Sequence, residues 1–157
     1  MEFRTFKKQW GAEFISSDVV RFRVWAEGQK DLTLRLSDND IPMMATGNGW
    51  FQVDVPGLAH GVEYQYVLQD GMAIPDPASR AQKGDVNGPS LAIDPGRYLH
   101  ANRGWKGRAW EETVVYELHI GTFTPEGTFR AAIAKLPYLA ELGITQLEVM
   151  PVSQFGG

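Results

Sequence analysis

The last part of the sequence, residues 114–157, limits most strongly what this chain can fold into. Residues 114–120 (VVYELHI) and 144–150 (ITQLEVM) are short apolar runs typical of β-strands, and the segment between them predicts a helix. Two strands joined through a helix form a βαβ unit with parallel strands, which are normally covered on both faces. One such unit cannot provide that cover. We therefore expect residues 114–157 to begin a (β/α)8 barrel, completed by a missing remainder or covered by self-association.

The predicted helix covers residues 128–142. Its apolar residues recur mostly at three- and four-residue steps and form one stripe, namely Phe129, Ile133, Leu136, Leu139, Ala140 and Leu142. Thr128 has the side chain of an N-cap, and Gly143 stands where a left-handed residue would end the helix. Pro137 lacks a backbone donor, so we expect it to kink or split the helix.

Residues 11–98 have the two-residue period of β-strands, clearest in residues 20–25, 32–36, 50–55 and 63–68. Turn signals separate these runs, namely Asp38-Asn39-Asp40, Gly47-Asn48-Gly49 and Asp70-Gly71. Leu91-Ala92-Ile93 can add an edge strand. The pattern predicts an all-β immunoglobulin-like sandwich of six or seven strands. We thus expect a sandwich domain over 1–98, a connector over 99–113 and the incomplete barrel over 114–157.

Composition excludes several classes of function. The net charge of −4 gives no footprint for nucleic acid or an anionic membrane, and there is no cysteine for a disulfide or thiolate site. The first eight residues carry no apolar run of the kind found in signal peptides, and no segment reaches the length of a membrane span. We expect a soluble cytoplasmic protein without a cofactor.

Several segments together resemble a known family. Residues 117–129 (ELHIGTFTPEGTF) resemble the first barrel strand and following loop of the maltooligosyltrehalose trehalohydrolases, which belong to the α-amylase superfamily of glycoside hydrolases. Residues 142–152 resemble the second barrel strand, and residues 75–80 (PDPASR) and 87–90 (NGPS) resemble the linker of that family. The resemblance spans nearly the whole chain in order, and the segments 75–80 and 121–129 are its most specific parts.

The resemblance implies an enzyme that releases trehalose from maltooligosyltrehalose by a retaining mechanism with two carboxyl groups. These two groups, and a third carboxylate that holds the sugar hydroxyls, lie on the fourth, fifth and seventh barrel strands of the superfamily, whereas this sequence stops after the second. No residue here matches them, so we expect no catalytic residue in this chain and no activity from the chain alone. The α-glucan or maltooligosyltrehalose substrate would bind through the missing barrel. Two alternatives remain, namely the N-terminal part of a glycogen branching or debranching enzyme, and a stand-alone carbohydrate-binding or structural module.

One cluster could transfer protons. Glu117 and His119 share one face of the first predicted strand, and Glu148 would lie on the neighbouring strand. A polar layer within the barrel is the simpler interpretation, because position in a fold is weak support for a site.

Trp25 and Trp50 could stack on sugar rings, since the predicted sandwich resembles the starch-binding modules of the superfamily. Those modules carry one platform tryptophan just after the Asp-Gly hairpin, where this chain has Met72-Ala73-Ile74, and the other platform position is also without an aromatic residue. We therefore expect little affinity for glycogen, and expect both tryptophans to pack against the barrel.

No metal site is expected. His60, His100 and His119 lack the spacing of metal ligands, and Asp85-Val86-Asn87-Gly88 is better explained as a turn than as a calcium loop.

Overall fold

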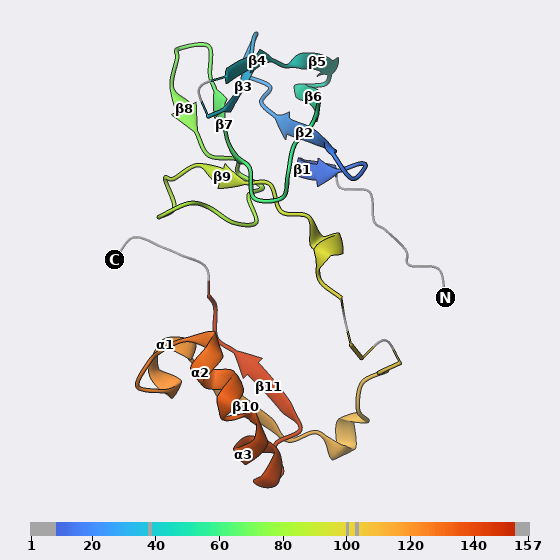
Figure 1. Cartoon of the computed structure of the whole chain (residues 1–157), viewed down its shortest axis with the longest axis vertical. Coiled ribbons are helices and arrows are strands. Elements are labelled where there is room, and N and C mark those ends of the chain that lie inside the picture. Colours follow the sequence, from blue (N-terminus) through green and yellow to red (C-terminus); the bar gives the residue numbers. More distant parts are fainter. Residues whose placement is uncertain (1–8, 38, 100, 103, 153–157) are drawn as a thin grey trace. The chain divides into compact units, whose positions relative to one another are not determined.

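The computed structural model describes residues 9–37, 39–99, 101–102 and 104–152 (Figure 1). Asp38 and His100, which belong to two of the patterns above, lie outside the described residues. The contacts within the chain divide it into two compact units, with the division after Leu99.

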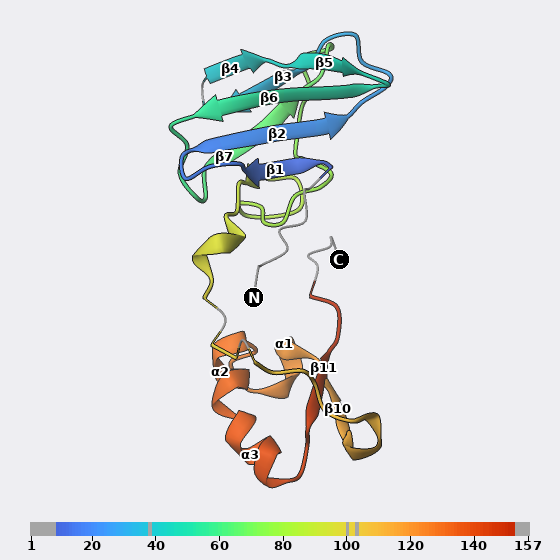
Figure 2. The same cartoon turned by 90° about the vertical axis from the view of Figure 1, so that its right-hand side faces the viewer.

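The first unit consists of two antiparallel sheets. One sheet has the order β1-β2-β6-β5 and contains β1 (Gly11–Phe14), β2 (Val19–Trp25), β6 (Trp50–Pro56) and β5 (Met44–Gly47). The other has the order β4-β3-β7-β8 and contains β4 (Asn39–Pro42), β3 (Thr33–Leu36), β7 (Glu63–Val67) and β8 (Ala73–Ile74). The short strand β9 (Ser90–Leu91) also pairs with β7. Figure 2 shows the first sheet in front of β3 and β7.

The core lies between these two sheets because every second side chain of the strands points inward. In β2, Val20, Phe22 and Val24 are buried, whereas Arg21 and Arg23 are only partly covered. The alternation in residues 20–25, 32–36, 50–55 and 63–68 predicts a core of eight residues, of which seven are buried and Val53 packs partly against them: Phe22, Val24, Leu34, Leu36, Phe51, Tyr64, Tyr66 and Val53.

Charged pairs lie on the outer faces of both sheets. Arg21 donates two hydrogen bonds to its register partner Asp54, at 2.8 and 2.7 Å, and Arg35 does the same to Asp40 at 2.7 and 2.7 Å. The hydrogen bond from Arg21 lowers the pKa of the Asp54 carboxyl. Because Arg21 and Asp54 are 37% and 36% exposed, their pair contributes at most about 1 kcal/mol to stability.

Two of the three predicted turns join strands in the structure. Asp70-Gly71 does join β7 to β8, with Gly71 at a φ of 84°, and Gly47-Asn48-Gly49 does join β5 to β6. Asn39 and Asp40, however, belong to strand β4 rather than to a turn. The chain already reverses at Ser37, whose φ of 53° is in the left-handed region.

The number of strands is underestimated from sequence. Nine strand segments occur among the described residues of the first unit, whereas six or seven were predicted. The added segments have two to four residues, too few for alternation to be recognised. An edge strand was expected at residues 91–93, and β9 lies one residue earlier, at Ser90–Leu91.

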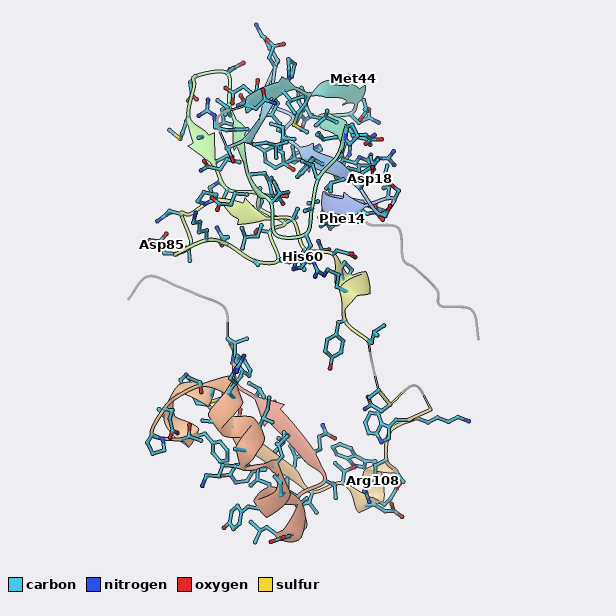
Figure 3. The ribbon with its side chains drawn as sticks, in the orientation of Figure 1. Phe14, Asp18, Met44, His60, Asp85 and Arg108 are labelled. Carbon is cyan, nitrogen blue, oxygen red and sulfur yellow. The ribbon has the colours of Figure 1, made fainter. Side chains whose placement is uncertain are left out.

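The first unit ends in a short 3-10 turn, η1 (Pro95–Arg97). Asp94 caps it through a hydrogen bond of 2.8 Å accepted from the Gly96 backbone N–H. The Asp94 backbone N–H in turn donates to Nδ1 of His60, which is labelled in Figure 3, at 3.0 Å. This contact ties the segment after β9 to the loop between β6 and β7.

The second unit contains one βαβ arrangement, as predicted. After the 3-10 turn η2 (Trp110–Glu112) come β10 (Val115–Leu118), α1 (Ile120–Phe123), α2 (Phe129–Ala134), α3 (Leu136–Glu141) and β11 (Gln146–Val149). Strands β10 and β11 are parallel, with Val115 opposite Gln146. The described residues include no helix long and apolar enough to cross a membrane.

The first predicted strand of this unit was too long. Strand β10 stops at Leu118, and Ile120 already begins α1. The backbone N–H groups of Thr122 and Phe123 donate to the His119 carbonyl at 3.1 and 3.0 Å, which closes a helical turn there. The apolar run of residues 114–120 does not reveal this turn, because Ile120 suits either structure.

The predicted helix is split, as expected at Pro137. Lys135 separates α2 from α3, and Pro137 occupies the first turn of α3. Thr128 caps α2 by accepting a hydrogen bond of 3.2 Å from the Ala131 N–H. Gly143, at a φ of 94°, ends α3.

The predicted apolar stripe is not one buried face. Leu139 is 3% exposed, whereas Phe129, Ile133 and Leu142 are 54–61% exposed. The split at Lys135 breaks the helical period on which the stripe was based.

Candidate functional site

The two carboxylates of the predicted proton-transfer cluster do lie side by side. Glu117 of β10 and Glu148 of β11 are register partners in the parallel pair. Both are exposed, as is His119. Among the described residues no hydrogen bond or ion pair joins these three side chains. His119 lies outside β10, and its ring covers the start of α1, since a Cβ added at Gly121 would be 2.9 Å from its Cε1.

The two faces of the β10–β11 pair differ in character. Val115, Glu117, Gln146 and Glu148 share one face by strand alternation, and all four are exposed. The opposite face carries Tyr116, Leu118, Leu147 and Val149, of which Leu118 is buried at 6% exposure whereas Tyr116 and Val149 are 36% and 42% exposed. A face with two directly opposed carboxylates is a polar surface that mildly destabilises the pair, because like charges repel across strands.

A second candidate site lies in the first unit, at one end of the sheet β1-β2-β6-β5. Trp25 ends β2 and is the register partner of Trp50, which begins β6. Trp10 precedes β1, and its ring is parallel to that of Trp50, with centroids 6.2 Å apart and an angle of 2° between the planes. Figure 2 shows the end of β2 and the starts of β6 and β1 at the same end of this sheet. We call Trp10, Trp25 and Trp50 the tryptophan surface.

Specific contacts hold the rings of the tryptophan surface. The Trp25 indole Nε1–H donates to the Asn48 carbonyl at 3.0 Å. A Cβ added at Gly49 would lie 2.8 Å from that same Nε1, so the turn fits closely under the ring. Arg23 covers Trp50, with its Cζ 4.4 Å from the ring centroid, in a cation–π contact. Trp10 and Trp25 are nevertheless each 55% exposed.

The tryptophan surface borders a cavity of about 540 Å³. The remaining lining residues are Val24, Asp76, Pro77 and Ala78. Asp76 is 4% exposed and supplies the carboxylate of this lining. The cavity is therefore mainly aromatic and apolar, with one buried carboxylate at its wall.

Asp76 is already engaged in a buried hydrogen-bond network. One carboxylate oxygen accepts from the Tyr64 hydroxyl at 2.7 Å and from the Tyr66 hydroxyl at 3.3 Å, and the other accepts from the Ala78 N–H at 2.8 Å. Its backbone N–H donates to Ser90 Oγ at 2.9 Å. Burial, and then the nearby carboxylate, raises the pKa of both tyrosines well above the ordinary value.

The sequence patterns do not point to two of these features. No pattern singles out Trp10, and Asp76 stands out only as part of the segment 75–80. Trp10 stands just before a short strand, and that position alone is a weak signal. Asp76 lies between two prolines at the end of a β pattern, and this position could have suggested a buried carboxylate that holds the chain in place.

Among the described residues, no group of three or more His, Asp or Glu side chains could hold a metal ion. Asp85, labelled in Figure 3, closes a turn, since its Oδ1 accepts from the Asn87 N–H at 2.8 Å and its carbonyl accepts from the Gly88 N–H at 3.0 Å.

Comparison with known proteins relates the chain to a set of enzymes. No family model matches it. The malto-oligosyltrehalose trehalohydrolase of Deinococcus radiodurans is 39% identical over 138 residues, which are 88% of this chain and 23% of that protein. That of Saccharolobus solfataricus is 41% identical over 144 residues, which are 91% of this chain and 26% of that protein. This chain matches the N-terminal part of the malto-oligosyltrehalose trehalohydrolases. It spans about a quarter of the length of these trehalohydrolases.

A solved structure resembles the whole of the described fold. A candidate α-amylase from Salmonella typhimurium is 67% identical, with a TM-score of 0.92 over 97% of this chain and 26% of that one. A 1,4-alpha-glucan branching enzyme of Streptomyces avermitilis is 30% identical over 157 residues, 88% of this chain and 19% of that protein. The pullulanase of Bacillus acidopullulyticus, at 23% identity and a TM-score of 0.74 over 96% of this chain and 23% of that one, shares the fold. The mostly-sheet first unit thus matches N-terminal domains of α-amylase-type enzymes, as the trehalohydrolase resemblance predicted.

Proposed function

We propose that this chain is the N-terminal part of a retaining glycoside hydrolase of the α-amylase superfamily, which releases trehalose from maltooligosyltrehalose. The observation that carries the proposal is the similarity to malto-oligosyltrehalose trehalohydrolases, at 35–44% identity over most of the chain. The chain would supply no catalytic carboxylate, and the parent would work in the cytoplasm on an α-glucan substrate bound by its complete barrel.

In this proposal the first unit is an immunoglobulin-like sandwich. Such sandwiches place strands A, B, E and D in one sheet and C, F and G in the other. The orders β1-β2-β6-β5 and β4-β3-β7-β8 agree with that scheme if β1, β2 and β3 are A, B and C.

The second unit would be the first βαβ of a (β/α)8 barrel. The polar exposed face of Val115, Glu117, Gln146 and Glu148 supports this, because in a barrel one face of each strand points into the interior, where side chains pack in layers. Glu117 and Glu148 would then form part of a polar layer rather than an acid–base pair.

A direct test compares two activities of the parent protein, produced from the reading frame that continues this sequence. Incubated with maltooligosyltrehalose, the parent should release trehalose, measured by anion-exchange chromatography. Incubated with amylose, it should introduce no α-1,6 branches, measured by the iodine-stain spectrum and by debranching analysis. Branching of amylose without trehalose release would favour the branching-enzyme alternative, which the relative from Streptomyces avermitilis supports. A reading frame that ends with this sequence would favour the stand-alone module.

A further inference from the structure

Two Asn-Gly steps occur in the first unit. Asn48-Gly49 forms the turn between β5 and β6 (Figure 2), and Asn87-Gly88 lies in the loop that precedes β9. Both asparagines are exposed. The side-chain amide of an asparagine can react with the backbone nitrogen of the following residue, and glycine hinders this reaction least because it has no side chain. The two steps therefore carry the same intrinsic chemistry, and any difference between them comes from the fold.

The turn between β5 and β6 requires the dipeptide that makes it reactive. Gly47 pairs with Trp50, which leaves Asn48 and Gly49 as the two residues of the hairpin turn. Their φ angles are 51° and 77°, in the left-handed region that such two-residue turns demand. Asparagine is enriched in this region, and glycine adopts it without strain. The hairpin thus favours Asn-Gly at this position although the same pair is chemically labile.

The reacting nitrogen is engaged at one step and free at the other. The Gly88 backbone N–H donates to the Asp85 carbonyl at 3.0 Å, and the Asn87 N–H donates to Asp85 Oδ1 at 2.8 Å. Neither the Asn48 N–H nor the Gly49 N–H donates a hydrogen bond to any of the described residues. Because the nitrogen must lose its proton to react, a hydrogen bond that holds this proton slows the reaction. The fold therefore restrains the step at Asn87 and leaves the step at Asn48 unrestrained.

We propose that Asn48 is a site of spontaneous deamidation, and that the isoaspartate formed there detaches the ring of Trp25 from the turn. The Gly49 nitrogen forms a bond to Cγ of Asn48 and gives up its proton, and the side-chain amide leaves as ammonia. Water then opens the resulting cyclic imide. Cleavage of the bond from nitrogen to Cγ gives aspartate, whereas cleavage of the bond from nitrogen to the α-carbonyl carbon gives isoaspartate. The net reaction consumes one water and releases one ammonia, and it does not depend on the proposed function.

The two products differ in their effect on the tryptophan surface. The Trp25 indole N–H donates to the α-carbonyl oxygen of Asn48 at 3.0 Å. In isoaspartate this carbonyl becomes a free carboxylate, and the backbone of the turn gains one carbon atom. The longer turn no longer suits the register in which Trp25 lies opposite Trp50. Aspartate keeps the original backbone and changes only an exposed side chain.

The test follows both asparagines of the 157-residue chain during incubation at mildly alkaline pH. The water is enriched in the heavy isotope of oxygen, so that mass spectrometry of peptides counts only conversion during the incubation. In the folded chain Asn48 should convert at least about tenfold faster than Asn87, because reaction at Asn87 must first break the hydrogen bond of the Gly88 N–H. In guanidinium chloride, where the chain is unfolded, the two asparagines should convert at similar rates.

Variants connect the chemistry to the ring of Trp25. Asn48→Gly removes the reacting amide but keeps a residue that adopts a positive φ, so conversion at this position should disappear while the chain stays folded. Asn87→Gly is the matched control and should leave the rate at Asn48 unchanged. In nuclear magnetic resonance spectra of the aged chain, a second indole N–H signal of Trp25 should grow in proportion to the isoaspartate. Asn48→Asp, which represents the other product, should keep the original Trp25 signal.

Three results would overturn the assignment of Asn48. These are no incorporation of heavy oxygen at this residue in the folded chain, conversion of Asn87 at an equal or higher rate in the folded chain, and the same ratio of rates in the folded and unfolded chains. The last result would mean that local sequence alone sets the difference. A single, unchanged Trp25 signal while isoaspartate accumulates would refute the proposed detachment of the ring.

Discussion

Tyr64 donates a hydrogen bond of 2.7 Å to the buried carboxylate of Asp76, and this contact fastens the segment after β8 to the core strand β7. Asp76 stands between two prolines, which cannot donate backbone hydrogen bonds, so its side chain takes over the anchoring. The network also forms the wall of the cavity beside the tryptophan surface.

Removing the Asp76 carboxylate should destabilise the first unit strongly. Asp76→Ala leaves two tyrosine hydroxyls and the Ala78 N–H without their acceptor, so we expect a loss of about 3 kcal/mol in the free energy of unfolding. Asp54→Ala, which removes a half-exposed carboxylate paired with Arg21, should cost at most about 1 kcal/mol. Urea unfolding of both variants checks the contrast, and equal losses would show that Asp76 is not an anchor.

The same network predicts loss of stability at alkaline pH. Burial raises the pKa of Tyr64 and Tyr66 in the folded state, so the folded chain keeps these protons at pH values where the unfolded chain releases them. The resulting stability is fully present below about pH 10, the ordinary tyrosine pKa, and is lost as pH rises. The slope should be about 1.4 kcal/mol per pH unit for each tyrosine.

Urea unfolding between about pH 9 and pH 12 measures that slope. Tyr64→Phe removes one of the two titrating groups and should reduce the slope by about half. An unfolding free energy that stays constant across this range in the unsubstituted chain would contradict the buried network.

Gly49 should be required for the orientation of Trp25. Its φ is 77°, and an added Cβ would lie 2.8 Å from both Trp25 Nε1 and Glu27 Cβ. Gly49→Ala should therefore lower stability by about 2 kcal/mol and shift the Trp25 indole signal. Gly57→Ala is a matched control with a φ of 76° and open space around the Cβ, so it should cost only about 1 kcal/mol and leave Trp25 unchanged.

The 157-residue chain alone should not hydrolyse maltooligosyltrehalose or maltooligosaccharides. No residue in it matches a superfamily catalytic carboxylate, and Glu117 and Glu148 lie on an exposed face without hydrogen bonds to other described side chains. Trehalose or glucose release that scales with protein concentration would contradict this. Loss of such activity in Glu117→Gln or Glu148→Gln would then identify the responsible carboxylate.

Alternation predicted the fold wherever it extended over several residues. It placed Phe22, Val24 and Tyr66 in the core, and Pro137 correctly marked the split between α2 and α3. It did not reveal β4 or α1, because their bounds depend on the reversal at Ser37 and on hydrogen bonds to the His119 carbonyl. Tertiary contacts, not local pattern, decide such boundaries.

The sequence predicted a candidate site only where regular strand pairing brings its residues together. Glu117 and Glu148 meet because two strands of a βαβ unit pair in register. Trp10 reaches Trp50 by a side-chain contact that no period in the sequence describes. The expected packing of Trp25 and Trp50 against the barrel remains a prediction.

The most direct test of the account is amide hydrogen exchange, measured on this chain and on the parent protein. If the second unit is the first βαβ of a larger barrel, the amides of β10 and β11 should exchange quickly in the isolated, monomeric chain, because one face of the pair is exposed. In the parent they should be protected about 100-fold more, while β2 and β6 should be equally protected in both. Equal protection of β10 and β11 in the two proteins, with the 157-residue chain shown to be a monomer, would contradict the account.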